Sequence, residues 1–335
     1  MWLDLSERDL TLLHALQIAP RTSWAAAAEV LGASAARLAE RWQRLRSAGL
    51  AWVTSYPAPI PGSPVIGFLE IECPSGDRSS VERALCLDPR VASIEETARG
   101  RDLLATVFVR DVQQLAGFVR GDLAEVTRGA RCQTHLATAV HQHGSSWRLD
   151  ALDAVQIRAF EAIAAKDHPE PGVMPPPNAG PLMEALSMDG RATAAELARM
   201  TGRESATVRR QLPRLLASGV LTFRCEVSQL ASHWPFSCTY FARIPAKQHE
   251  RTAAALRTLP ELRQCVATTG RTNLMFTFWV RSLERLLDLE SVLEERLPWL
   301  QIIDSSVTLR TLKRMGWMLD EHGRAVRMVP LTPIL

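Results

Sequence analysis

Apolar residues recur with helical spacing near the start of the chain, and cap residues divide this stretch into short helices. Leu10, Leu13 and Leu16 mark the apolar face of a first helix, and Ser6 precedes it as an N-cap. The next two helices begin at caps and end at glycines, from Thr22 or Ser23 to Gly32 and from Ser34 to Gly49. Three short helices with a glycine turn between the second and third predict a helix-turn-helix.

A proline-rich connection follows, and beyond it the apolar pattern changes from helical spacing to strand-like runs. Two amphipathic stretches interrupt these runs and predict helices. The elements are expected at residues 65–73, 78–86, 91–97, 102–110, 112–123 and 133–140. Their order, strand–helix–strand–strand–helix–strand, is that of a ferredoxin-like unit.

Much of this pattern occurs a second time along the chain. The stretch Arg21–Leu50 aligns without gaps with Arg191–Val220, and the two share arginines, leucines and glycines at corresponding positions. Asp88–Arg110 matches Leu259–Arg281 at nearly the same offset. Between the copies, Leu149–Ala165 predicts an additional helix, and the proline-dense segment after it predicts a semi-rigid spacer. We therefore expect two copies of one unit.

The expected fold is α+β, with two copies of a winged or three-helix helix-turn-helix domain, each followed by a ferredoxin-like βαββαβ sensor domain. The second helix-turn-helix is expected to begin at Pro181 and to gain support from the helix over Leu149–Ala165. The domains are expected at residues 1–55 (helix-turn-helix 1), 64–144 (sensor 1), 145–180 (helix and proline-rich linker), 181–225 (helix-turn-helix 2), 226–316 (sensor 2) and 317–335 (tail).

Composition places the chain among ordinary soluble proteins. Of its 335 residues, 47% are hydrophobic and 22% are charged. No apolar run is long enough to span a membrane, and the acidic N-terminus is unlike a signal peptide, so we expect a cytoplasmic protein with no membrane partner. The scattered cysteines include no CxxC pair, so neither a zinc site nor a disulfide framework is indicated, and no cofactor is expected.

The net charge is only +3, but almost all basic residues are arginines, which suit bidentate contacts to phosphate and guanine. A GC-rich genome that encodes arginine in place of lysine explains this equally well. In the third helix, Arg37, Arg41 and Arg44 share one face opposite an apolar face, and we expect that face to contact double-stranded DNA. The residues expected to bind DNA are Ser34, Arg37, Arg41 and Arg44 in the first copy and Ser205, Thr207, Arg209, Arg210 and Arg214 in the second.

The second copy departs from the first at Pro213, inside its third helix. A proline in a helix interior removes a backbone hydrogen bond and costs roughly 3 kcal/mol or kinks the helix. Insertion of this helix into a DNA groove is therefore less favoured than insertion of its counterpart.

These residues resemble the Lrp/AsnC family of bacterial transcriptional regulators, in a tandem-duplicated form. The resemblance lies in the opening LSERDLTLLHALQ, the R-x-S/T-x3-A before the second helix, the R-x-x-R-L-x-x-x-G-L/V closing the third, and the sensor, which the family calls the RAM domain. It covers nearly the whole chain except the linker. It implies DNA binding through the third helix, assembly through the sensor domains, and binding of amino acids or other small molecules between those domains.

The family's ligand loop joins the second and third sensor strands and reads Gly-x-x-Asp. The first copy keeps the acid but has arginine at the glycine position, whereas the second keeps the glycine but has an amide for the acid. Glycine allows a positive φ and exposes backbone N–H groups, and a carboxylate can hold an amino group. The arginines of the first loop could instead recognise an acidic ligand, and two plain hairpin turns are the simplest alternative. The candidate effector-binding residues are Arg99, Gly100, Arg101 and Asp102 in the first copy and Thr268, Thr269, Gly270 and Asn273 in the second.

No enzymatic constellation stands out, so the chain is not expected to be an enzyme, and no catalytic or metal-binding residue is predicted. His141 and His143 lie near each other but lack a third ligand, and they are explained as polar residues of a frayed strand end. Two alternatives to a regulator stay open. Some relatives of this architecture are siroheme decarboxylases, for which His135 is the only suitably placed strand histidine; another alternative is a ligand-independent architectural DNA-binding protein.

The expected partners follow from the same resemblance. They are double-stranded DNA and a small-molecule effector such as an amino acid. If the two sensor domains pair within one chain, each monomer is an intramolecular pseudo-dimer with two different DNA readers. Whole chains are further expected to form a homo-oligomer.

Overall fold

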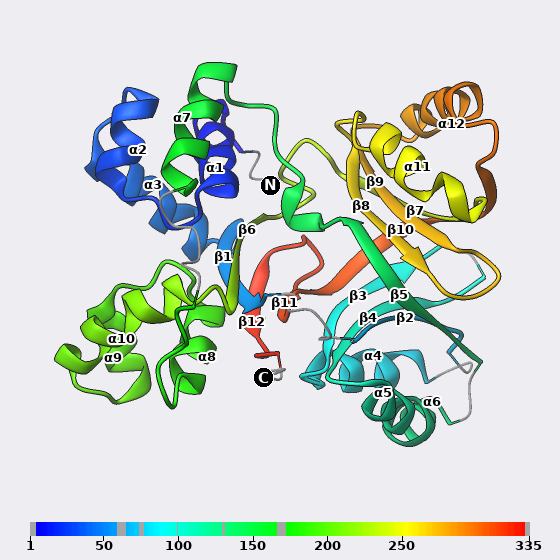
Figure 1. The fold of residues 1–335 in the computed structure, drawn as a ribbon, viewed down its shortest axis with the longest axis horizontal. Helices are drawn as coiled ribbons and strands as arrows, with labels where there is room; N and C mark the ends of the chain where they lie inside the picture. Colours follow the sequence, from blue (N-terminus) through cyan, green and yellow to red (C-terminus); the bar gives the residue numbers. More distant parts are fainter. Residues whose placement is uncertain are drawn as a thin grey trace. The chain divides into compact units, whose positions relative to one another are not determined.

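The computed structural model describes residues 5–58, 65–73, 77–98, 100–128, 131–165 and 172–331. The chain forms two compact units, which we describe separately (Figure 1). The helical unit contains the elements from α1 to β1, from α7 to β6, and β12. The barrel unit contains those from β2 to η2 and from β7 to β11. In the described part of the chain, no helix is long and apolar enough to cross a membrane.

The first half of the helical unit has the predicted helix-turn-helix. Its elements are α1 (Glu7–Ile18), α2 (Trp24–Leu31), α3 (Ala35–Ser47) and β1 (Ala51–Pro57). Ser6 caps α1 in a capping box with Asp9, and Ser23 and Ser34 cap α2 and α3. Gly32 ends α2 with a φ of +62°, a conformation that costs glycine little. The predicted helix ends are therefore confirmed.

The second half repeats this order of elements after one further helix. Its elements are α7 (Ala154–Ala164), α8 (Gly180–Met188), α9 (Ala194–Thr201), α10 (Ser205–Ala217) and β6 (Leu221–Val227). Helix α10 continues through Pro213, which lies close to its C-terminal end. The expectation that α7 supports the second helix set is wrong, since α7 packs against α1 and α2. His14 Nδ1 and Gln17 Oε1 hold the segment before α7 by accepting hydrogen bonds from backbone N–H groups, Leu149 among them.

Strands β1 and β6 pair antiparallel in a two-stranded sheet that joins the two helix sets of this unit. Two arginines at matching positions of the repeat strengthen this junction. Arg191 donates to the carbonyl oxygens of Pro20 (2.5 Å) and Thr22 (2.7 Å), and its guanidinium lies 4.0 Å from the centre of the Trp24 ring. Arg21 in turn donates to the carbonyl oxygen of Gly190. Strand β12 (Ala325–Met328) also belongs to this unit.

The barrel unit contains the predicted strands and helices of both sensors. Its strands are β2 (Val65–Ile71), β3 (Val91–Thr97), β4 (Leu103–Val109), β5 (Cys132–Gln142), β7 (Phe236–Arg243), β8 (Leu262–Thr268), β9 (Leu274–Val280), β10 (Gln301–Arg314) and β11 (Trp317–Leu319). They run in the order β10-β3-β4-β2-β5-β8-β9-β7, and β7 pairs with β10 to close the ring. Two separate ferredoxin-like domains were expected, and one closed barrel is found. The physical reason is that β5 pairs with β8 and β3 with β10, which satisfies edge strands that would otherwise be exposed.

Helices cover the outside of this barrel (Figure 1). They are α4 (Arg78–Leu87), α5 (Val112–Phe118), the π-helical turn η1 (Val119–Leu123) and α6 (Ala124–Thr127) in the first half, and α11 (His249–Leu256) and α12 (Glu284–Arg296) in the second. Short 3-10 turns are η2 (Gly144–Ser146) and η4 (Ala246–Gln248). Each half has its own apolar core between helices and strands. A third cluster, which includes Phe68, Phe241 and Met275, brings together strand residues of both halves inside the ring.

Candidate functional site

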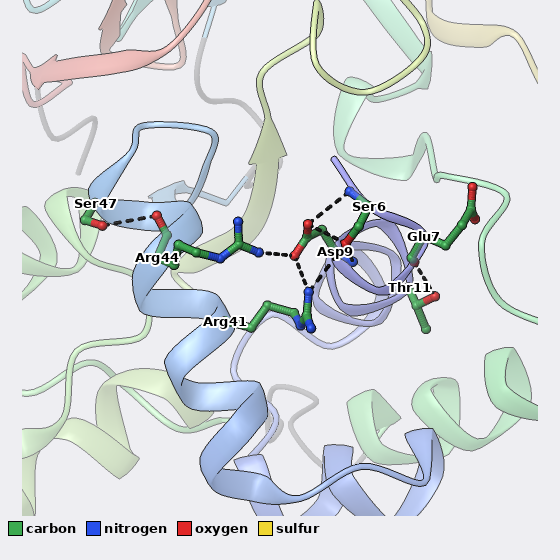
Figure 2. A network of polar contacts seen from close by, with 7 residues as sticks. All are labelled: Ser6, Glu7, Asp9, Thr11, Arg41, Arg44 and Ser47. Carbon is green, nitrogen blue, oxygen red and sulfur yellow. Dashed lines mark hydrogen bonds and ion pairs between the residues drawn. The ribbon is translucent and has the colours of Figure 1, made fainter. Parts of the chain in front are cut away.

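The basic face of α3 is partly neutralised within its own domain, as Figure 2 shows. Arg41 Nη1 lies 2.6 Å and Arg44 Nη2 lies 2.5 Å from Oδ1 of the buried Asp9. Burial opposes the ionisation of Asp9, but hydrogen bonds from Ser6 and Arg41 and the charge of Arg44 outweigh it and lower the pKa of the carboxyl. Arg37 is exposed and makes no ion pair among the residues that the structure describes. Of the three predicted arginines, Arg37 is therefore the one left available.

The corresponding helix α10 presents a different set of side chains. Arg209 and Arg210 are exposed, and Ser205 and Thr207 are half-buried. Arg214 Nε donates to the carbonyl oxygen of Met174 (2.9 Å), so this arginine ties α10 to the preceding segment. The N-cap of α10 is the acidic Glu204, with no side-chain cap, whereas Ser34 caps α3. The two predicted readers therefore differ in both charge and capping.

The first predicted ligand loop follows β3, and its acid already has partners. Arg99 lies outside the described residues. Gly100 has a φ of +66°, as expected for a tight turn. Asp102 Oδ2 accepts a hydrogen bond from the backbone N–H of Cys73 (2.6 Å), and its Oδ1 lies 3.4 Å from Arg78. Asp102 therefore holds neighbouring segments of its own half.

The second predicted loop, after β8, is held in the same way. The Asn273 amide accepts from the backbone N–H of Ile244 (2.9 Å) and donates to its carbonyl oxygen (2.8 Å). Thr269 Oγ1 accepts from the backbone N–H of Leu136 (3.0 Å), and Thr268 Oγ1 donates within the loop. Gly270 has a φ of +115°, and a Cβ there would lie 3.2 Å from Nδ1 of His135. The glycine thus allows the loop to pass over this imidazole.

The fourth predicted residue of the first loop, Arg101, belongs to a buried charged cluster. Its Nε lies 2.5 Å from Oε2 of Glu70, and its Nη2 contacts Asp304 on β10. The guanidinium carbon is 4.3 Å from the centre of the Phe241 ring. Within the described chain, Nη1 of Arg101 is buried and has no hydrogen-bond partner. A buried donor without a partner costs roughly 1–3 kcal/mol, which favours an acceptor at this position.

His135 completes the cluster and connects it to the second loop. Its Nε2 lies 2.6 Å from Oε1 of Glu70, and its Nδ1 lies 3.2 Å from the carbonyl oxygen of Thr269. The hydrogen bond to Glu70 outweighs burial and raises the pKa of His135, so the protonated form is favoured. The cluster joins two carboxylates to two cationic groups, and it links both predicted ligand loops.

Glu70 and Asp304 were not among the predicted site residues. They lie on β2 and β10, far apart in sequence, and both contact Arg101 in the turn between β3 and β4, because β2 pairs with β4 and β10 pairs with β3. The available signal was an acidic residue inside the otherwise apolar run VIGFLEI. His141 lies at a strand end as predicted, since β5 ends at Gln142, but it is not frayed there, because its ring stacks on His249 with ring centres 5.9 Å apart.

The structure combines helix-turn-helix sets with a barrel that holds a cluster of acidic and basic side chains. This combination defines a class of proteins, and two family models match parts of it. The AsnC-type helix-turn-helix domain matches residues 5–46, and the Lrp/AsnC ligand-binding domain matches residues 239–318. The chain therefore contains an AsnC-type helix-turn-helix domain and an Lrp/AsnC ligand-binding domain. No curated protein matches it.

Solved structures share the fold over almost the whole chain. The siroheme decarboxylase NirDL is 12% identical with a TM-score of 0.57, covering 95% of this chain and 96% of that one. Its complex with an iron-uroporphyrin III analogue is 15% identical with a TM-score of 0.58, covering 92% and 93%. A transcriptional regulator of Neisseria meningitidis bound to L-Met is 19% identical with a TM-score of 0.36, and it covers 42% of this chain and 93% of that one.

At these identities the likeness to NirDL shows the fold alone. It is nevertheless sufficient to correct one expectation. The chain was not expected to be an enzyme, but an enzyme has the same architecture from end to end. That expectation is therefore overturned, and an enzymatic role is compatible with this fold.

Proposed function

We propose that this protein is an Lrp/AsnC-type regulator that binds duplex DNA through α3 and α10 and responds to a small molecule at the sensor barrel. The observation that carries the proposal is the junction of the two helix sets. The β1–β6 pairing and the reciprocal contacts of Arg21 and Arg191 hold two helix-turn-helix sets together in one unit. One chain would then be an intramolecular pseudo-dimer, built by tandem duplication, with two readers of fixed separation.

The two readers favour an asymmetric operator. Helix α3 offers Arg37 and the Asp9-bound arginines, whereas α10 offers Arg209 and Arg210 after an acidic N-cap. Different side chains favour different base edges. A single chain should therefore prefer two unlike half-sites, and symmetry would return only if whole chains associate into a homo-oligomer.

Mobility-shift titration against the DNA upstream of the gene tests this proposal. We expect salt-sensitive binding, because each arginine that contacts phosphate displaces counterions. Arg37→Ala should weaken specific binding by at least about tenfold, since tenfold is about 1.4 kcal/mol and one good base contact contributes roughly 1–3 kcal/mol. Arg199→Ala, an exposed arginine on α9, is the matched control and should leave binding unchanged. No shift at low salt, or equal losses from both variants, would contradict the proposal.

A second candidate is an enzyme of the siroheme decarboxylase type, and the buried cluster together with the whole-chain likeness favours it. Decarboxylation replaces a carboxylate by a proton, and a protonated imidazole such as His135 can supply that proton. Arg101 could hold an acidic side chain through its unpartnered Nη1. This would use the cluster as a catalytic centre rather than as an effector site.

Anaerobic incubation of the purified chain with siroheme tests the second candidate. Mass spectrometry should show loss of carboxyl groups as CO2, and His135→Gln should slow this loss at least a hundredfold. Arg37→Ala should leave it unchanged. Intact siroheme after incubation, combined with DNA binding, would exclude the enzyme and retain the regulator.

A further inference from the structure

A second polar cluster lies in the barrel unit, formed by residues other than those of the predicted ligand loops. Arg263 and Arg314 both stack on Trp279, with guanidinium carbons 4.1 and 4.9 Å from the ring centre. Both arginines are more than nine-tenths buried. Glu95 lies close enough that both arginines affect its pKa, although burial raises that pKa overall. The two guanidinium groups and the Glu95 carboxyl therefore form a charged cluster beside Trp279.

Arg314 forms part of the lining of a cavity of about 120 Å³. Gln229 and Ser237 line it as well, and the exposed Arg310 and Glu321 lie at its edge. At roughly 30 Å³ per water molecule, this is the space of about four waters. The cavity therefore suits a compact molecule and is too small for a tetrapyrrole. None of the predicted effector-binding residues lines it.

Among the buried polar groups of the lining, Gln229 Nε2 and Ser237 Oγ have no hydrogen-bond partner in the described part of the chain. Gln229 is 7% exposed and Ser237 is 2% exposed. The orientation of the Gln229 amide is fixed because its Oε1 accepts from Arg314 Nη2 (3.1 Å). Its Nε2 is consequently left as a donor without an acceptor. Unsatisfied buried polar groups are rare in folded proteins and point to a missing partner.

We infer that this cavity binds a compact monocarboxylate. An amide N–H and a hydroxyl beside a buried guanidinium supply donors for both oxygens of a carboxylate. Asp320 and Glu321 also belong to the lining, and their charges oppose a dianion such as phosphate. The inference does not depend on DNA binding or on siroheme chemistry.

Calorimetric titration of the full chain with acetate, in a buffer free of other carboxylates, tests this inference. We expect saturable binding of acetate, and no saturable binding of phosphate. Ser237→Ala should weaken acetate binding about three- to tenfold, the effect of one hydrogen bond. Gln229→Glu keeps an oxygen for Arg314 but replaces the donor by a negative charge, so binding should be lost.

Ser306→Ala is the matched control. Ser306 Oγ is also buried and without a partner in the described chain, but it does not line the cavity. This variant should bind acetate as the unmodified protein does. The inference is overturned if acetate gives no saturable heat, if phosphate binds equally well, or if Ser237→Ala and Gln229→Glu bind acetate normally.

Discussion

Replacing Arg191 by methionine should weaken the helical unit at the junction of its two helix sets. Methionine keeps much of the apolar stem, but it removes the donors to Pro20 and Thr22 and the contact with Trp24. Hydrogen bonds from a charged donor contribute roughly 1.5–3 kcal/mol each, and a cation–π contact contributes about 0.5–2 kcal/mol.

Burial offsets part of this gain. Desolvation is the main cause that lowers the pKa of Arg191 to about 10, well below the usual value for arginine. At about 1.4 kcal/mol per pH unit, the offset is roughly 3 kcal/mol. The net contribution of Arg191 is therefore about 2 kcal/mol, which corresponds to a fall in Tm of roughly 4–8 °C for a unit of this size.

The measurement combines thermal unfolding with hydrogen exchange of the β1 and β6 amides. Exchange reports the opening of this sheet separately from the unfolding of the barrel unit. Arg191→Met should accelerate exchange about thirtyfold, equivalent to 2 kcal/mol. Arg199→Met, on the exposed side of α9, is the control and should change neither quantity. Unchanged exchange in Arg191→Met would refute the claim that this arginine stabilises the junction.

Three further predictions concern other sites. Asp9→Asn should strengthen DNA binding and its salt dependence, because two arginines of α3 lose their partner. The same variant should lack the stability that Asp9 contributes above pH 3.8 and that the unmodified protein loses as the pH falls through the lowered pKa of Asp9. Measuring unfolding as a function of acid pH would show this difference. His135→Gln should remove stability that is fully present below pH 6.5 and is lost as the pH rises through the raised pKa of His135, so urea unfolding of the two proteins should converge at alkaline pH. Gly270→Ala should destabilise the barrel unit by more than about 1 kcal/mol, because its φ is +115° and the added Cβ would lie only 3.2 Å from Nδ1 of His135. Gly117→Ala in α5 is the control and should not destabilise the unit, because a Cβ there meets no atom within 4 Å.

The helices were predictable because their signals are local. Ser6, Ser23 and Ser34 each lie within three residues of the backbone N–H groups that they cap, so the pattern and the structure agree. The order of strands and helices along the chain in each sensor follows from the same kind of local pattern. Closure of the ring was not predictable, because alternation shows which face of a strand is buried but not which edges pair.

The residues of the candidate site were likewise predictable only where their sequence signal is local. Arg101 and Gly270 were identified from loop patterns, which are contiguous in sequence. Glu70 and Asp304 could not be assigned, because they become neighbours of Arg101 only through contacts between strands that lie far apart along the chain. Predicting that cluster requires knowing that β10 pairs with β3 and that β2 pairs with β4.

Strand β10 has a role that no strand of a single-copy sensor can have within its own chain. It pairs with β7 through residues 301–307 and with β3 through residues 308–313, so one continuous strand belongs to both halves of the barrel. The halves cannot separate without breaking a strand's pairing or the chain itself. Because one strand belongs to both halves, the two halves remain in a one-to-one ratio for as long as the chain is intact. A sequence change in one half therefore has to remain compatible only with the other half of the same chain.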